Sequence, residues 1–189
     1  MQYLVADINC FTDSEIQAAL SQMPLEQKEY ITNKKCELSR KQSIVARILV
    51  KKLLLNFGIC DGYNISFDTN GKPCYSNSSD VYLSVSHSKE VVAAAVSNKP
   101  VGIDIQVYKK INDKLVDKVC SNEECRFVKS EGDKFFFKIW TVKEAYSKCT
   151  QMKLSDVFKL SFVKDDSIYG LDKKLYSYST DLYELSIIE

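Results

Sequence analysis

The chain has 189 residues, with 26 Lys and Arg, 25 Asp and Glu, and a single histidine. One histidine excludes a zinc site built on two or three histidines, and a net charge of +1 gives no overall basic field for a nucleic-acid partner. No apolar segment approaches the roughly 20 residues of a membrane helix and no signal-peptide pattern is present, so we expect a cytoplasmic protein with no membrane partner.

The first elements are predicted from capping signals and apolar periodicity. Residues 3–9 predict a strand, and capping-box spacing around Thr12 and Ser14 predicts a helix that starts near Ser14. Pro24 is expected to open a short helix. The clearest helix covers residues 38–57, where apolar side chains recur on one face, and Gly58 is a typical residue just after a helix end.

The remaining elements are predicted by alternation and composition. Strands are expected at 64–68, 81–86, 91–97 and 101–106, with a turn at Asn70-Gly71. Helices are expected at 113–129 and 134–150, and closing strands at 157–163, 167–170, 175–179 and 182–188. The order predicts an α+β fold.

The nearest thing to a domain boundary is Asn98-Lys99-Pro100, which divides the chain into residues 1–98 and 99–189. The sequence contains seven cysteines and no CxxC motif, so neither a disulfide framework nor a structural zinc site is expected. Buried or incidental thiols in a reducing compartment explain them.

The strand from Val101 to Gln106 contains a carboxylate in an otherwise apolar pattern. Burying Asp104 is costly unless it is paired, hydrogen-bonded or bound to a metal, and Gly102 permits the close approach of a ligand or of backbone. An Asp at the exposed end of an edge strand explains the same pattern equally well.

Two further segments carry chemistry-bearing residues. On the helix from Trp140 to Lys148, Glu144 and Lys148 share a face, which fits either a surface ion pair or a site partly covered by the Trp140 ring. The strand that ends in Ser86-His87-Ser88 offers donors for phosphate when a turn follows. No G-x-S-x-G motif is present, which disfavours hydrolase chemistry; a turn histidine without a ligand is the plain alternative.

In order, these motifs resemble the Sfp-type 4′-phosphopantetheinyl transferase family. The matching segments are Gly71-Lys72-Pro73, Ser86-His87-Ser88, Gly102 to Gln106, and Trp140 to Lys148, with the helix at 38–57 resembling the family's N-terminal half. The Trp and Ala variants of the last motif are similar to the W/KEA subgroup.

The resemblance implies a pseudo-dimer of two similar α+β halves with coenzyme A between them. It implies transfer of the 4′-phosphopantetheine arm of coenzyme A to a serine of an acyl, peptidyl or aryl carrier protein, with release of 3′,5′-ADP. The expected catalytic residues are Asp104, Glu144 and Lys148, with Glu144 as the base and Lys148 as a phosphate contact. The expected Mg²⁺ ligands are Asp104, Glu144 and, more weakly, Gln106.

Gln106 departs from the commonest family form, in which Glu is a third metal ligand. Its amide oxygen is still a possible ligand, but one negative charge is absent from the site. A catalytically impaired module that binds coenzyme A is therefore the alternative function, and a scaffold that binds only carrier proteins is a third.

The resemblance also implies a set of contacts to coenzyme A. The residues expected to contribute are Lys72, Pro73, Ser86, His87, Lys143, Lys148 and Arg40. The carrier protein is expected to belong to fatty-acid synthesis or to polyketide or nonribosomal peptide biosynthesis. A monomer is expected, because one chain already carries both halves.

Overall fold

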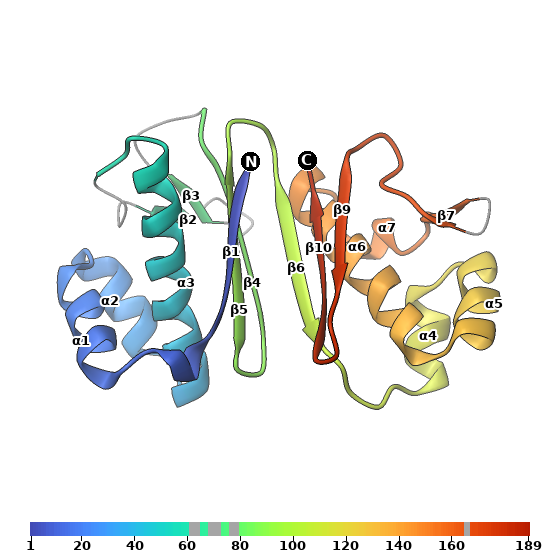
Figure 1. Ribbon diagram of the computed structural model, residues 1–189, viewed down its shortest axis with the longest axis horizontal. Coiled ribbons are helices and arrows are strands. Elements are labelled where there is room, and N and C mark those ends of the chain that lie inside the picture. Colours follow the sequence, from blue (N-terminus) through green and yellow to red (C-terminus); the bar gives the residue numbers. More distant parts are fainter. Residues whose placement is uncertain (61–64, 68–72, 76–79, 165–166) are drawn as a thin grey trace. The chain divides into compact units, whose positions relative to one another are not determined.

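The computed structural model describes residues 1–60, 65–67, 73–75, 80–164 and 167–189. The chain divides into two compact units, Met1–Lys99 and Pro100–Glu189, called here the N-terminal unit and the C-terminal unit (Figure 1). Each unit combines helices with an antiparallel sheet, so the predicted α+β class is confirmed. Among the described residues, no helix has the length and apolar content needed to cross a bilayer.

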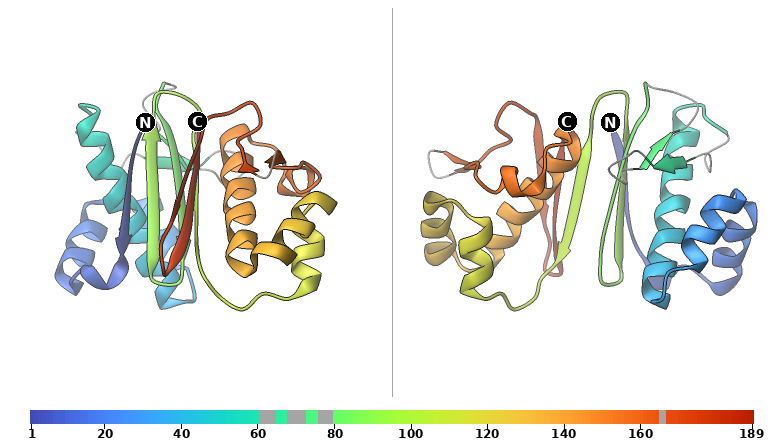
Figure 2. Two further views of the ribbon diagram at one scale, coloured as in Figure 1. Left: turned by 45° about the vertical axis from the view of Figure 1, so that its right-hand side comes forward. Right: turned by 180° about the vertical axis from the view of Figure 1, so that it is seen from behind.

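The N-terminal unit is a three-stranded sheet with helices on one face. The strand order is β1-β5-β4, and both pairings are antiparallel. The helix α3 packs on this sheet, with α1 and α2 beside it (Figures 1 and 2). The elements are β1 (Gln2–Asp7), the 3₁₀ turn η1 (Ile8–Cys10), α1 (Asp13–Gln22), α2 (Leu25–Thr32), α3 (Glu37–Asn56), β2 (Ile65–Phe67), β3 (Pro73–Tyr75), β4 (Tyr82–Ser88) and β5 (Val91–Ser97).

Local signals explain where these helices begin and end. Thr12 caps α1 in a reciprocal capping box with Glu15, so of the two candidate boxes the earlier one forms. The long helix ends at Asn56, and Gly58 follows with φ of 75°, as predicted for a residue just after a helix end. The core is formed by the apolar face of α3 packed on alternate residues of β5, including Val45, Leu49, Leu53, Val92, Ala94 and Val96.

The C-terminal unit repeats the plan of a three-stranded antiparallel sheet covered by a long helix. Its strand order is β6-β10-β9, and α6 lies along this sheet with α5 against the helix (Figure 1). The elements are β6 (Gly102–Val107), α4 (Asp113–Val119), α5 (Asn122–Glu131), α6 (Asp133–Thr150), α7 (Leu154–Val157), β7 (Val163–Lys164), β8 (Ser167–Ile168), β9 (Leu175–Ser179) and β10 (Tyr183–Ile188).

Two predicted elements in this unit are wrong. The single helix expected at 113–129 is two helices, because Ser121 forms a capping box with Glu124 and starts α5 as a new helix. The strand expected at 157–163 is instead the end of α7 followed by turns, with strand structure only from Val163. In both places the apolar spacing concealed a break between two elements.

Candidate active site

The close contact between β6 and α6 positions the candidate site. A Cβ atom placed on Gly102 would overlap the Ala145 carbonyl oxygen and lie 2.6 Å from the Cys149 backbone nitrogen. Only glycine therefore permits this approach, and the neighbour it admits is the helix backbone. Because side chains alternate along a strand, Asp104 and Gln106 project from the same face of β6 as Gly102, toward α6.

Asp104 is held by a lysine from that helix. Lys148 Nζ lies 2.7 Å from Asp104 Oδ1 and also donates to the Ile103 carbonyl oxygen at 3.0 Å. The Asp104 side chain is 3% exposed and that of Lys148 is 27% exposed. The carboxylate is therefore not at an exposed strand end, and the amine retains access to solvent.

Glu144 lies one helical turn before Lys148 and is half-buried. Burial raises the pKa of Glu144, and the nearby negative charge of Asp104 raises it further, while Lys148 lowers it. Two carboxylates that interact in this way disfavour each other's ionised form, and a cation between them relieves that repulsion. A carboxylate with a raised pKa is also better suited to accepting a proton near neutral pH.

The donor set fits a hard divalent cation. Asp104, Glu144 and Gln106 offer oxygen atoms, which are the ligands that Mg²⁺ prefers together with water and phosphate oxygens. Within the described part of the chain, no group of three or more His, Cys, Asp and Glu side chains is arranged to hold a metal. Two carboxylates and one amide would leave positions on Mg²⁺ for water and for phosphate oxygens.

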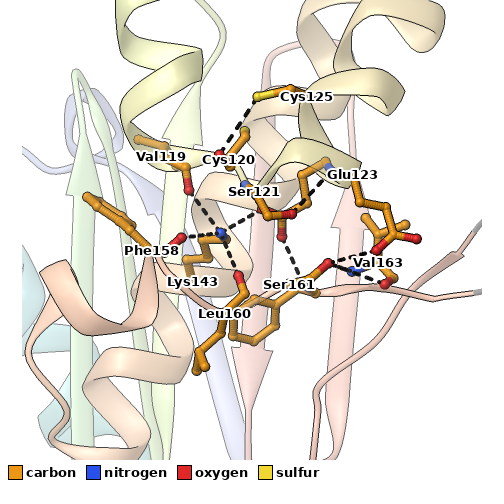
Figure 3. A network of polar contacts seen from close by, with 12 residues as sticks. Val119, Cys120, Ser121, Glu123, Cys125, Lys143, Phe158, Leu160, Ser161 and Val163 are labelled. Atoms are coloured by element: carbon orange, nitrogen blue, oxygen red, sulfur yellow. Dashed lines mark hydrogen bonds and ion pairs between the residues drawn. The ribbon is translucent and has the colours of Figure 1, made fainter.

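Lys143 is buried inside the C-terminal unit, whereas a coenzyme A contact is expected at the surface of the site. Its side chain is 0% exposed and its Nζ lies 2.7 Å from Glu124 Oε2, which is also 0% exposed. The same Nζ donates to the carbonyl oxygens of Val119, Phe158 and Leu160 at 2.8, 3.2 and 2.9 Å (Figure 3). All three of its protons have acceptors inside this unit, so the expectation of a phosphate contact is corrected to a structural role.

Trp140 packs among aromatic side chains of the C-terminal unit. Its ring lies 5.9 Å from that of Phe136 and 6.0 Å from that of Phe158, measured between centroids. The Trp140 ring therefore contacts its own helix and the end of α7. That the ring also covers the site at Glu144 stays a prediction.

The other expected coenzyme A contacts belong to the N-terminal unit. Ser86 and His87 lie on β4, where Ser86 is buried and His87 is exposed. Arg40 lies in the first turn of α3 and is half-buried. Nearby in the helix, Gln42 donates to the carbonyl oxygen of Lys89 at 2.6 Å, which brings this end of α3 to the turn that follows His87.

Of the two remaining predicted contacts, Lys72 and Pro73, the structure describes only the second. Lys72 lies outside the described residues, as do Asn70 and Gly71. Pro73 is the first residue of β3 and pairs with Phe67 of β2. Their roles at a phosphate stay predictions.

Sequence reasoning missed two buried carboxylates of the C-terminal unit. Glu124 accepts hydrogen bonds from Lys143 and from the Phe162 backbone nitrogen, the latter at 2.8 Å. Glu184 lies on β10 with 1% exposure, directly opposite Gln106 in the strand register. The capping-box spacing of Ser121 was an available signal for Glu124, whereas nothing local distinguishes Glu184 from an exposed strand residue.

Part of the chain matches a family model and several curated proteins. Residues 100–181 match the model of the 4′-phosphopantetheinyl transferase superfamily. The 4′-phosphopantetheinyl transferase gsp of Aneurinibacillus migulanus is 34% identical over 113 residues, which are 57% of this chain and 47% of the relative. The 4′-phosphopantetheinyl transferase Sfp of Bacillus subtilis (strain 168) is 27% identical over 136 residues, which are 67% of this chain and 61% of the relative.

A third relative, the 4′-phosphopantetheinyl transferase psf-1 of Bacillus pumilus, is 27% identical over 124 residues, or 62% of this chain and 53% of the relative. The chain thus matches about half the length of these curated relatives. Asp104, Glu144 and Lys148 all fall inside the segment that the superfamily model matches.

Proposed function

We propose that this chain, a member of the 4′-phosphopantetheinyl transferase superfamily through its residues 100–181, transfers the 4′-phosphopantetheine arm of coenzyme A to a serine of an apo carrier protein. The observation that carries the proposal is the cluster of Asp104, Glu144 and Lys148 between β6 and α6. This cluster brings two acids and one amine together in a partly buried site. A phosphoryl transfer that breaks a pyrophosphate bond can use an acid as a proton acceptor and an amine to stabilise the charge on the leaving phosphate.

The chemistry assigns one task to each residue. The carrier serine hydroxyl attacks the β-phosphorus of coenzyme A, a new P–O bond forms, and the pyrophosphate bond to 3′,5′-ADP breaks. Glu144 receives the serine proton, directly or through water, and its half-buried position favours the protonated product. Lys148 carries a positive charge that balances the charge developing on the leaving phosphate.

A bound Mg²⁺ would neutralise charge on the pyrophosphate oxygens. Asp104 and Glu144 would hold it with their carboxylates, and Gln106 would contribute an amide oxygen. The remaining ligands would be water and phosphate oxygens. Asp104 is held in place for this task by its strand and by Lys148.

A set of contacts to coenzyme A is also part of the proposal. In addition to Lys148, the residues proposed to contact it are Lys72, Pro73, Ser86, His87 and Arg40. His87 is exposed and carries ring nitrogens that donate to phosphate, and Arg40 offers a guanidinium. Lys143 is not included because its protons are already used.

The pseudo-dimeric fold is part of the proposal, and the matching topology of the two units supports it. In each sheet the last strand is central, flanked by the first strand and the penultimate strand: β1-β5-β4 and β6-β10-β9. In each unit a two-stranded sheet, β2-β3 or β7-β8, comes between the long helix and the final hairpin. Such agreement is expected of two copies of one ancestral unit.

A panel of apo carrier proteins tests the function. The chain is incubated with coenzyme A, Mg²⁺ and acyl, peptidyl and aryl carriers, and each carrier is weighed by mass spectrometry. A mass gain of one phosphopantetheine on any carrier supports the proposal. No gain on any carrier, with a folded enzyme and with Mn²⁺ also tried, contradicts it.

A coenzyme A-binding module without transfer activity is the second candidate, favoured by the amide at position 106. Calorimetry with coenzyme A, with and without Mg²⁺, separates the two. Metal-dependent binding together with transfer supports the enzyme, and metal-independent binding without transfer supports the module. A role in polyketide or nonribosomal peptide biosynthesis, a monomeric state and a cytoplasmic location stay predictions, as does the W/KEA subgroup.

A further inference from the structure

Glu184 is a buried carboxylate on the sheet face that carries the candidate site. In the antiparallel register of β10 and β6, Glu184 lies directly opposite Gln106, and Ser186 lies opposite Asp104. Side chains of directly opposed residues project from the same face of a sheet. Ser186 hydrogen-bonds Thr141 of α6 at 2.8 Å, which shows that this face of β10 is the one that α6 covers.

The carboxylate of Glu184 is held by two hydroxyl groups. Tyr108 donates its phenolic proton to Glu184 Oε2 at 3.1 Å, and Ser177 donates to Oε1 at 3.0 Å. Both carboxyl oxygens are therefore occupied as hydrogen-bond acceptors. Glu184 is only 1% exposed, so water has little access to this group.

No basic side chain within the described residues neutralises Glu184 at ion-pair distance. Lys134 is close to this region, but its Nζ lies over the Tyr108 ring, 5.1 Å from the centroid. A buried carboxylate without a counter-charge is costly, and a cation bound nearby would lower that cost. The neighbouring strand β6 contains Asp104 and Gln106, two of the three residues proposed to hold a divalent cation.

We propose that Glu184 supplies, from the neighbouring strand, the negative charge that an amide at position 106 leaves out of the cation site. Its two oxygens are engaged by Tyr108 and Ser177, so Glu184 acts through its charge and not as a metal ligand. Glu184 is therefore a positioning residue, whose negative charge attracts the bound cation. Gln106 would contribute the neutral amide oxygen that contacts the cation. This inference rests on the proposed function for the identity of the cation site.

Mn²⁺ binding tests this charge without coenzyme A, carrier or turnover. The free Mn²⁺ signal is measured by electron paramagnetic resonance with the full chain, and folding is checked by circular dichroism. Glu184→Gln is expected to weaken Mn²⁺ binding at least about fivefold, as removal of one nearby charge does at a partly wet site. Adding Gln106→Glu to this variant moves the charge across the strand pair and is expected to restore the binding.

Tyr108→Phe is the matched variant, because it removes a hydrogen bond to Glu184 but keeps the charge. Tyr108→Phe is expected to bind Mn²⁺ as tightly as the unmodified chain does. This measurement can be made even if the Glu184→Gln variant does not fold. The proposal is overturned by unchanged binding in Glu184→Gln, by no restoration in the double variant, or by a large loss in Tyr108→Phe. Absence of Mn²⁺ binding to the unmodified chain also overturns it, while the carrier panel tests transfer separately.

Discussion

Lys148 of α6 reaches Asp104 of β6, with 2.7 Å between Nζ and Oδ1, and this ion pair joins the helix and strand that carry the candidate site. The two residues are 44 positions apart in the sequence. Lys148 is more exposed than Asp104, so solvent reaches the amine while the carboxylate is buried. The pair thus places an accessible positive charge beside a buried negative one.

The first prediction concerns that positive charge. Lys148→Met is expected to lower kcat/KM for transfer by about 100-fold or more, the range seen when one charge-stabilising donor is removed. Steady-state kinetics with a carrier identified by the panel measure this. Lys159→Met is the control, since that lysine is 74% exposed and pairs only with Asp156 at the surface. Equal activity of both variants would contradict a role of Lys148 at the phosphate.

The second prediction concerns the buried pair of Lys143 and Glu124. Lys143→Met leaves a buried carboxylate without its cation and is expected to lower the free energy of unfolding by about 3–5 kcal/mol. Urea denaturation measures the change. The variant that remains folded is expected to keep its KM for coenzyme A, whereas a phosphate contact at Lys143 would raise that KM.

The third prediction concerns the contact of Gly102 with α6. Gly102→Ala is expected to destabilise the chain by about 3 kcal/mol or more, because the added methyl group meets helix backbone that cannot move aside alone. Gly58→Ala is the matched control: no atom lies within 4 Å of the added carbon, and φ is +75°. Its cost is expected to be about 1 kcal/mol, from left-handed backbone strain only. Similar losses in the two variants would contradict the close packing.

The fourth prediction concerns the pH dependence of thiol alkylation. The backbone N–H and hydroxyl of Ser39 lower the pKa of Cys36, whereas burial, followed by the charge of Glu124, raises the pKa of Cys120 to about 12. The thiolate is the reactive form, so alkylation of Cys36 should increase at a lower pH than that of an ordinary thiol. Cys120 should stay unmodified between pH 7 and about 9.

Iodoacetamide labelling followed by peptide mass spectrometry measures both rates across this pH range. Labelling in denaturant provides the reference, in which the two cysteines should react alike. Fast labelling of Cys120 in the folded chain at pH 8 would contradict its burial beside Glu124.

The sequence predicted those parts of the molecule that depend on local patterns. The helix around Leu49 was found from its apolar spacing, and Asp104, Glu144 and Lys148 were found because ordered motifs carry them. Each of these residues has its sequence signal within a few positions of itself.

What could not be predicted depends on packing between distant segments. Lys143 is buried because Glu124, 19 residues earlier, and the carbonyl groups after α7 surround it. Alternation places Glu184 on one face of its strand, but only the position of α6 makes that face a buried one. The helix break at Ser121 had a capping signal, which the continuing apolar spacing concealed.

The central claim is tested most directly by weighing one apo carrier protein after incubation with coenzyme A, Mg²⁺ and either the unmodified chain or Glu144→Gln. The unmodified chain is expected to add one phosphopantetheine to a single serine and to release one 3′,5′-ADP for each carrier modified. Glu144→Gln is expected to bind coenzyme A in calorimetry but to leave the carrier mass unchanged. Full modification by Glu144→Gln, or none by the unmodified chain on every carrier tested, would contradict the account.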